Sequence, residues 1–249
     1  MARQLLKLVT VDVTNTLIRV AGSPGRQYAY VARKYGVDID ETLLTGIFLK
    51  EYKSYTKKYP NFGVMDGMPA NIWWSLLVKD CFRFVDSKIP EEMLDKISFD
   101  LYFHFTKPMA WDLLPGAVAA LEDLSQYPVK LGVISNWDHR LYKVLMVLKL
   151  RQFFDFILPS YIIGYEKPNS IIFHQALEDG RCEPHEAVHF GDNIEKDFIG
   201  AKNVGMNAYL LASEGVKNDF LDQSLVVKTV QEFVDKIRPQ LGERKADPV

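Results

Sequence analysis

One aspartate of this chain lies where a carboxylate is costly to bury. A short, largely apolar run from Leu5 to Val11 stands near the start of the chain, and Asp12 follows it at once. A carboxylate at the tip of a buried strand must meet a cation or a ligand that offsets its lost hydration. We therefore take Asp12 as a candidate nucleophile.

Other polar side chains follow the later apolar runs, at the points where strands would end. In chain order these are Ser135, Asn136, Lys167, Asp192 and Asp197. In an open parallel sheet, functional groups gather beyond the carboxyl ends of the strands. We expect these carboxylates, the hydroxyl and the ammonium to meet Asp12 at one edge of a sheet.

The strand-end carboxylates indicate a cation. Asp12 and Asp192 would repel each other without one, and Mg²⁺ suits such a site because it binds hard oxygen ligands. Asp197 comes five residues after Asp192, about 140° further round a helix, so we place Asp192 in a loop and Asp197 in the next helix's first turn. Lys167 precedes Pro168, which we expect at the first helical position. The Lys167 ammonium would offset the carboxylates and a bound phosphate.

Two sequence patterns surround these residues. Residues 21–108 show helical periodicity with Pro and Gly breakers, whereas short apolar strands alternate with helices after Pro115. The second pattern is typical of βαβ units and a parallel sheet covered on both faces. The expected later strands are 129–134, 156–158, 187–190, 208–211 and one near 225–227. The expected helices include 40–57, 71–84, 90–105, 115–125, 138–148, 168–179 and 195–204.

The sequence therefore predicts an α/β fold with an all-helical insertion after the first strand. We place the sheet domain at residues 1–20 and 109–238, the helical domain at 21–108, and a disordered tail at 239–249. The many aromatic rings of the helical block are interpreted as packing between its helices.

Composition narrows the function classes. The 249 residues are 48% hydrophobic and 25% charged, as in an ordinary globular protein. The formal net charge is -2 and the Lys and Arg residues are dispersed, so the sequence has no basic region of the kind that binds nucleic acid or an anionic membrane. The two cysteines are far apart, and His174, His185 and His189 lack metal-ligand spacing. Because no apolar stretch reaches the roughly 18 residues of a membrane span, we expect a cytoplasmic protein. We also expect it to act as a monomer.

The residues that end the apolar runs resemble the four motifs of the haloacid dehalogenase superfamily. The matching segments are Asp12-x-Thr14-x-Thr16-Leu17, Ser135-Asn136, Lys167-Pro168, and Gly191-Asp192 with Asp197. The helical insertion resembles the C1-type cap of that superfamily, and the likeness spans about Leu5 to Leu211. It implies a Rossmann-like core domain with a cap domain.

The resemblance implies a phosphohydrolase that works through an aspartyl-phosphate. Asp12 would attack the phosphorus in line. Mg²⁺ would be held by Asp12, the backbone carbonyl of Thr14 and Asp192, with Asp197 orienting the ligands around the metal.

The resemblance also implies a set of phosphate-binding residues. Thr16, Ser135 and Asn136 would bind the transferring phosphoryl group, and Lys167 would stabilise its negative charge. The substrate would be a small phosphorylated metabolite, with the cap closing over it.

Thr14 departs from the pattern of the efficient phosphatases of the superfamily, which carry an Asp acid-base residue there. A hydroxyl is a poor acid or base near neutral pH, and positioned proton transfer contributes roughly 10² to 10⁴-fold in rate. The sequence thus leaves open a slow hydrolase and a non-catalytic or regulatory phosphometabolite-binding protein. A haloacid dehalogenase ranks below both, because Asp192 has little use without a cation.

Overall fold

The computed structural model describes residues 5–212 and 221–245, and the chain divides into two compact units. The first unit holds the described residues up to Arg19, Leu113–Asn136 and the described residues from Lys149 onward. The second unit holds Val20–Asp112 and Trp137–Leu148. The division falls inside two short paired strands that the sequence did not predict, β2 (Ile18–Val20) and β3 (Trp111–Leu113).

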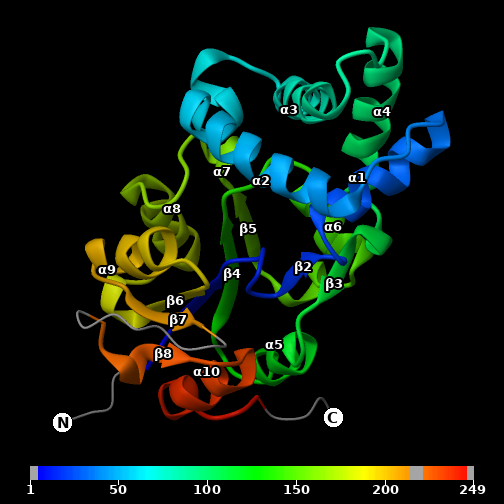
Figure 1. Cartoon of the computed structure of the whole chain (residues 1–249). Coiled ribbons are helices and arrows are strands. Elements are labelled where there is room, and N and C mark those ends of the chain that lie inside the picture. The colour runs from blue at the N-terminus through cyan, green and yellow to red at the C-terminus, as the bar shows by residue number, and fades with distance from the viewer. Residues whose placement is uncertain (1–4, 213–220, 246–249) are drawn as a thin grey trace. The chain divides into compact units, whose positions relative to one another are not determined.

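A six-stranded sheet organises the first unit (Figure 1). Its strand order is β5 (Phe156–Pro159), β4 (Lys130–Ser135), β1 (Leu8–Val11), β6 (Ala187–Gly191), β7 (Asn207–Leu211) and β8 (Val226–Val227). Every pairing in it is parallel. The predicted α/β class and parallel sheet are therefore confirmed.

The strand order reverses its direction of growth beside β1. From β1 the chain adds β4 and β5 on one side, then returns to add β6, β7 and β8 on the other. The register aligns Val11 of β1 with Val133 of β4 and Phe190 of β6. Residues that follow these three strands therefore share one edge, at the switch point where open α/β sheets bind ligands.

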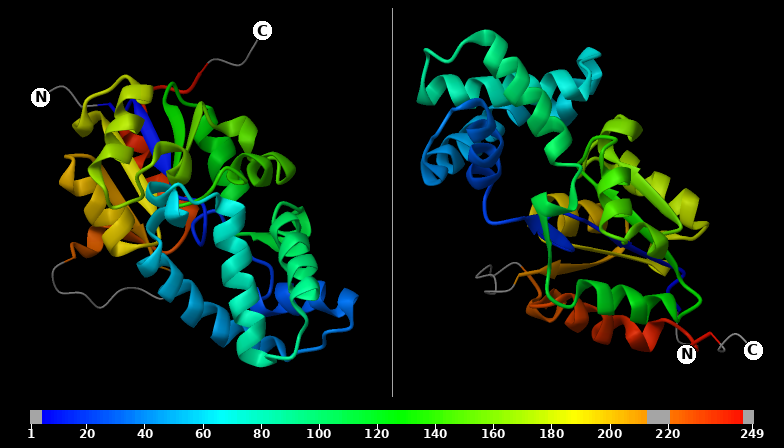
Figure 2. Two further views of the ribbon diagram at one scale, coloured as in Figure 1. Left: turned by 90° about the horizontal axis from the view of Figure 1, so that it is seen from above. Right: turned by 90° about the vertical axis from the view of Figure 1, so that its right-hand side faces the viewer.

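Helices cover both faces of the sheet (Figure 2). One face packs against α8 (Ser170–Gly180) and α9 (Gly200–Asn203), and the other against α5 (Ala117–Ser125) and α10 (Val230–Ile237). Strand side chains alternate between the faces. Leu8 and Ala187 accordingly join Phe173 of α8 in one core cluster, while Phe190 stacks on Phe233 of α10 at 4.2 Å between ring centroids.

The second unit is helical. Its helices are α1 (Pro24–Ala32), α2 (Glu41–Lys58), α3 (Ala70–Val85), α4 (Glu91–His104) and α6 (Leu141–Val147). Side-chain caps fix the first two starts, because Ser23 accepts from the Arg26 N–H and Asp40 from the Leu43 N–H. Within the described ranges, no helix of either unit has the length and apolar character needed to cross a membrane.

Residues 137–148 group with the helical unit, although we expected them in the sheet domain. The reason is a buried polar cluster at the start of α6. The Arg140 guanidinium pairs with Asp138 at 2.7 Å and lies over the ring of Tyr102, 4.0 Å from its centroid. Trp74 donates its indole N–H to Asp138 at 2.8 Å, so α3, α4 and α6 share one network.

The predicted disordered tail is wrong for residues 239–245. Leu241 is buried, Arg244 pairs with Asp123 of α5 at 2.7 Å, and the Lys245 N–H donates to the Gln126 carbonyl at 2.7 Å. The segment is mostly polar, so the sequence pattern did not reveal that Leu241 is buried or that Arg244 forms an ion pair. Residues 246–249 lie outside the described residues.

Candidate active site

Three carboxylates meet at the switch-point edge of the sheet. Asp12 follows β1, Asp192 follows β6, and Asp197 lies in a π-helical turn, Ile194–Ile199. Each offers a carboxylate oxygen, and these oxygens lie within 4.8 Å of one another. Asp12 and Asp197 are buried and Asp192 is partly exposed. Strands distant in sequence therefore bring the predicted acidic residues together.

Lys167 is the positive charge of this cluster. Its ammonium, 2% exposed, donates to Asp12 Oδ1 at 2.6 Å, Asp197 Oδ1 at 2.5 Å and the Ile134 carbonyl at 2.7 Å. An ammonium has three N–H donors, so all of them are used and the side chain is fixed. Burial alone would lower the pKa of Lys167, but the two carboxylates leave that pKa above its ordinary value.

The three carboxyl groups differ in how far nearby donors and positive charge offset the cost of burying their negative charge. Burial first, and then the charges of Asp12 and Asp197, raise the pKa of Asp192 to about 7. The pKa of Asp12 is also raised, mainly by burial, although Lys167 and Ser135 oppose the shift. Burial pushes the pKa of Asp197 in the same direction, but Lys167 and His189 hold it below its usual range.

The donor set fits a hard divalent cation. Three carboxylates against one ammonium leave an excess of negative charge. The Lys167 ammonium and the Ser135 hydroxyl both donate to Asp12 Oδ1, and Asp192 lies beside them only partly exposed. Both Asp197 oxygens are engaged, because Oδ2 accepts the Asn193 N–H at 2.9 Å and Oδ1 accepts from Lys167. Oxygen ligands of this kind suit Mg²⁺.

Two hydroxyls lie among the predicted phosphate-binding residues. Ser135 donates to Asp12 Oδ1 at 2.8 Å. Thr16 Oγ1 is buried and has no hydrogen-bond partner, and such an orphaned group costs free energy unless a ligand satisfies it. The turn that carries Thr16 is tight, because the N–H groups of Leu17 and Ile18 both donate to the Val13 carbonyl.

Asn136 was predicted to bind phosphate, but its side chain is engaged elsewhere. Its amide oxygen accepts the Lys167 N–H at 2.8 Å, and its amide nitrogen donates to the Lys167 carbonyl at 3.0 Å. The two bonds hold the Lys167 backbone from both sides. The sequence could not reveal this contact, because the Lys167 loop is brought beside Asn136 only by the pairing of β4 and β5.

The predicted helix start at Pro168 is wrong. The Lys167–Pro168 peptide is cis, and α8 begins at Ser170. Asn169 is the N-cap, and its side chain accepts the Ile171 N–H at 3.0 Å. Asn is a strong N-cap residue, which is the signal that could have placed the start correctly.

Two buried polar residues beside the cluster were missed. His189 of β6 lies with Nε2 3.2 Å from Asp197 Oδ1, and its Nδ1 lies 2.8 Å from Thr10 Oγ1 of β1. The sequence analysis judged His189 only by its lack of metal-ligand spacing, and so assigned it no role in the site. A histidine and a threonine inside otherwise apolar strands are the signal that sequence analysis left unused.

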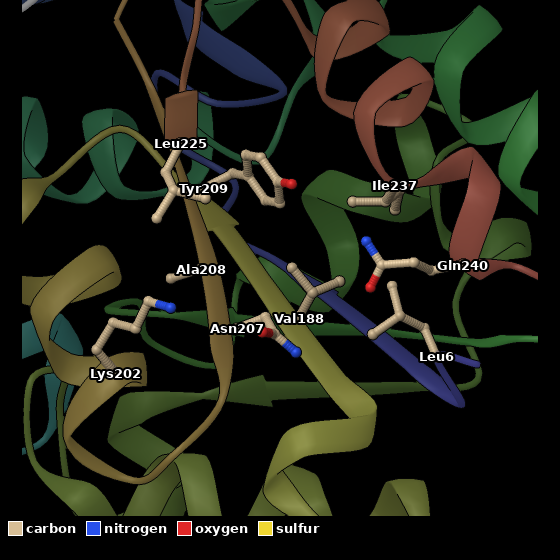
Figure 3. Close-up of a pocket in the computed structure, with 9 residues that line it drawn as sticks. All are labelled: Leu6, Val188, Lys202, Asn207, Ala208, Tyr209, Leu225, Ile237 and Gln240. Carbon is tan, nitrogen blue, oxygen red and sulfur yellow. The ribbon is translucent and has the colours of Figure 1, made fainter. Parts of the chain in front are cut away.

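A small cavity lies near the opposite edge of the sheet and takes no part in the cluster. Its volume is about 50 Å³, and Leu6, Asn207 and Gln240 are among its lining residues (Figure 3). Leu6 precedes β1 and Asn207 begins β7, so the cavity is near the amino ends of the strands. That volume holds a few waters at most.

Comparison with known proteins places this geometry in a family. The sequence model of the haloacid dehalogenase-like hydrolases matches residues 6–205, which include the whole acidic cluster. The chain belongs to the haloacid dehalogenase-like hydrolase family. The resemblance read from the four motifs of the sequence is thereby confirmed.

Relatives and solved structures agree with this family. The chain is 37% identical over 213 residues to haloacid dehalogenase-like hydrolase domain-containing protein 3 of Bos taurus, covering 85% of this chain and 84% of that protein. The 2-haloacid dehalogenase of Pseudomonas syringae has a TM-score of 0.67 at 19% identity, covering 94% of this chain and 99% of that one. The HAD-hydrolase YfnB of Bacillus subtilis, solved with magnesium, has a TM-score of 0.68 at 14% identity, covering 94% of this chain and 99% of that one. Both structures support the fold.

Proposed function

We propose that the chain is a Mg²⁺-dependent phosphohydrolase that transfers the phosphoryl group of a small phosphorylated metabolite to Asp12 and then to water. The observation that carries this proposal is the cluster of three carboxylates around one fully engaged ammonium. The cluster sets an ammonium against the nucleophile and leaves negative charge for a cation to balance. Magnesium bound to the related YfnB supports the choice of metal.

Asp12 is the proposed nucleophile. Lys167 and Ser135 both donate to its Oδ1, which fixes the plane of the carboxylate before a substrate arrives. Attack forms a bond from a carboxylate oxygen to phosphorus and breaks the bond from phosphorus to the leaving oxygen, which takes up a proton from water because Thr14 is a poor acid. Lys167 stabilises the charge on the transferring group, and the orphaned Thr16 hydroxyl donates to one of its oxygens.

The proposed metal ligands are the carboxylates of Asp12 and Asp192 and the backbone carbonyl of Thr14. When bound, Mg²⁺ supplies positive charge against the phosphoryl oxygens. Asp197 acts by holding other groups, because Lys167 and the Asn193 N–H already occupy its two oxygens. Asn136 is likewise assigned to holding the Lys167 backbone.

Magnesium is expected to raise the melting temperature, and Asp192→Asn is expected to remove most of that rise. Binding of the cation requires ionised Asp192, whose pKa is about 7 in the metal-free protein, so the rise should be larger at pH 8 than at pH 6. Scanning calorimetry with and without Mg²⁺ at both pH values tests this. Exposed Asp38→Asn is the matched control. An equal rise in wild type and Asp192→Asn contradicts the metal assignment.

Without the metal, Asp192 should make the protein less stable as the pH rises. Its pKa of about 7 in the folded chain exceeds the roughly 3.9 of a free aspartate, so the unfolded state gives up its proton first. The stabilising contribution is therefore complete below about pH 4 and is lost as the pH rises through 7.

Thr14→Asp is expected to raise turnover of an aryl phosphate by about tenfold or more. The substitution places a carboxyl two residues after the nucleophile, where it can protonate the leaving oxygen and then activate water, a role worth roughly 10² to 10⁴-fold when well positioned. Steady-state kinetics at saturating Mg²⁺ measures the effect, with Thr14→Asn as the control of similar size. A rate no higher than that of Thr14→Asn removes the acid-base explanation.

Thr14 also favours a second candidate, a non-catalytic phosphometabolite-binding protein. A hydroxyl supports binding as well as an acid would, but it supports turnover poorly. Binding of phosphorylated metabolites without any turnover, in wild type and in Thr14→Asp alike, would select this reading. Dehalogenation is disfavoured because it leaves the excess negative charge of the cluster without a use.

A further inference from the structure

We infer that His189 and Thr10 form a buried hydrogen-bonded pair that positions Asp197, and through Asp197 the ammonium of Lys167. The inference deepens the proposed function and rests on it, because positioning Lys167 matters only if Lys167 acts on a phosphoryl group. The hydrogen-bonded contact of the pair with the cluster is made through Asp197, which is not itself one of the proposed metal ligands. Both are therefore positioning residues.

The contacts form a continuous path from β1 to the nucleophile. Thr10 Oγ1 lies 2.8 Å from His189 Nδ1, and His189 Nε2 lies 3.2 Å from Asp197 Oδ1. The same Asp197 oxygen accepts from Lys167, which donates in turn to Asp12. Thr10 and His189 are 0% exposed, so both contacts are shielded from solvent.

The donors and acceptors along this path have one consistent assignment. The Asp197 carboxylate, held ionised beside Lys167, can only accept, so His189 Nε2 must carry the proton. Burial lowers the pKa of His189, and in the neutral ring Nδ1 is then an acceptor. The Thr10 hydroxyl must donate to it, in preference to its longer contact of 3.4 Å with the Val188 carbonyl.

The strands fix this geometry. Thr10 and His189 are register partners in the β1 and β6 pairing and project on the face covered by α8. The Phe173 ring meets the imidazole edge-on, at 5.4 Å between centroids, and prevents the ring from swinging away. The Asp197 carboxylate lies against the Gly191 backbone, where an added Cβ would come within 2.3 Å of Asp197 Cγ. Asp197 is thus confined on one side by glycine and on the other by histidine.

A packing role alone does not account for this pair. A buried hydroxyl and imidazole carry a desolvation cost that two apolar side chains would avoid. What the pair adds is a second donor to Asp197 Oδ1, beside Lys167, which holds the carboxylate that positions the ammonium. Groups behind a reacting or ligating residue commonly contribute about 10 to 100-fold.

The test compares Thr10→Val, which keeps the shape but loses the hydroxyl, with Thr10→Ser, which keeps the hydroxyl. With an aryl phosphate and Mg²⁺, we expect Thr10→Val to lower kcat about 10 to 100-fold with little change in KM. Thr10→Ser should restore most of the rate. A second measurement needs no activity: nitrogen-15 NMR of histidine-labelled wild-type protein should show His189 with its proton on Nε2, and Thr10→Val should alter that Nδ1 resonance.

The outcomes separate this inference from the proposed function. A folded Thr10→Val with wild-type kcat, or a His189 proton on Nδ1, overturns the positioning pair. Equal loss of kcat in Thr10→Val and Thr10→Ser also overturns it, because the hydroxyl would then not be the cause. If Thr10→Val does not fold, the NMR measurement of which His189 nitrogen is protonated in the wild-type protein decides whether the pair exists. If the wild-type protein neither binds Mg²⁺ nor hydrolyses any phosphate ester, the proposed function fails, while the tautomer still reports on the pair.

Discussion

Replacing Asp12 by Asn is expected to lower the hydrolysis of an aryl phosphate by about 10⁴-fold or more. The amide has the shape of the carboxylate but cannot act as the nucleophile at phosphorus. It also removes one negative charge from the proposed metal ligands. The measurement is the steady-state rate with Mg²⁺, and Asp38→Asn in the helical unit, whose side chain is 82% exposed, serves as the control.

Asp12→Asn should fold, which keeps its kinetic result interpretable. Ser135 can still donate to the amide oxygen, and Lys167 keeps its contacts with Asp197 and the Ile134 carbonyl. Removing a carboxylate that is buried among like charges relieves some desolvation. A variant with a native melting curve and more than about a tenth of the wild-type rate would show that the chemistry lies elsewhere.

Lys167→Met is expected to have the largest effect on stability. The ammonium is the shared partner of two buried carboxylates, and breaking a buried pair costs about 3 to 5 kcal/mol because it leaves uncompensated charge. The loss should be greater at pH 8 than at pH 5. Without Lys167 the pKa values of Asp12 and Asp197 rise, so the folded state prefers their protonated forms and loses stability as the pH rises.

Urea unfolding of Lys167→Met at both pH values measures this effect. Lys7→Met is the matched control, because Lys7 is an exposed lysine paired with Glu186 and surface pairs contribute little. Lys167→Arg should not rescue activity, since the planar guanidinium cannot direct three donors to the positions that the ammonium fills. An unfolding free energy that is unchanged, or lost equally at both pH values, would contradict the charge argument.

The sheet and its edge could be predicted because strand patterning is local. Apolar runs located β1, β4, β5, β6 and β7, and the rule that parallel strands end at one edge predicted that Asp12, Lys167 and Asp192 lie together. The position of Asp197 in the first turn after Asp192 followed from helical geometry alone.

The rest depends on contacts between segments that are distant in the chain. Asn136 holds the Lys167 backbone, and Thr10 meets His189, only because of how neighbouring strands pair. The first turn of α6 joins the helical unit through Arg140, whose aromatic partners come from other helices. No local pattern carries that information, whereas the Asn169 cap and the Leu241 anchor were local signals that a closer reading could have used.

The most direct test of the central claim is to look for the covalent intermediate. Wild-type protein mixed with an aryl phosphate and Mg²⁺, quenched in acid and digested, should yield one phosphorylated peptide, with the phosphoryl group on Asp12. Thr14 in place of an acid-base residue should slow its hydrolysis and favour its accumulation as a burst. A burst of product without any phosphoryl group on Asp12, or one on another residue, would contradict the account.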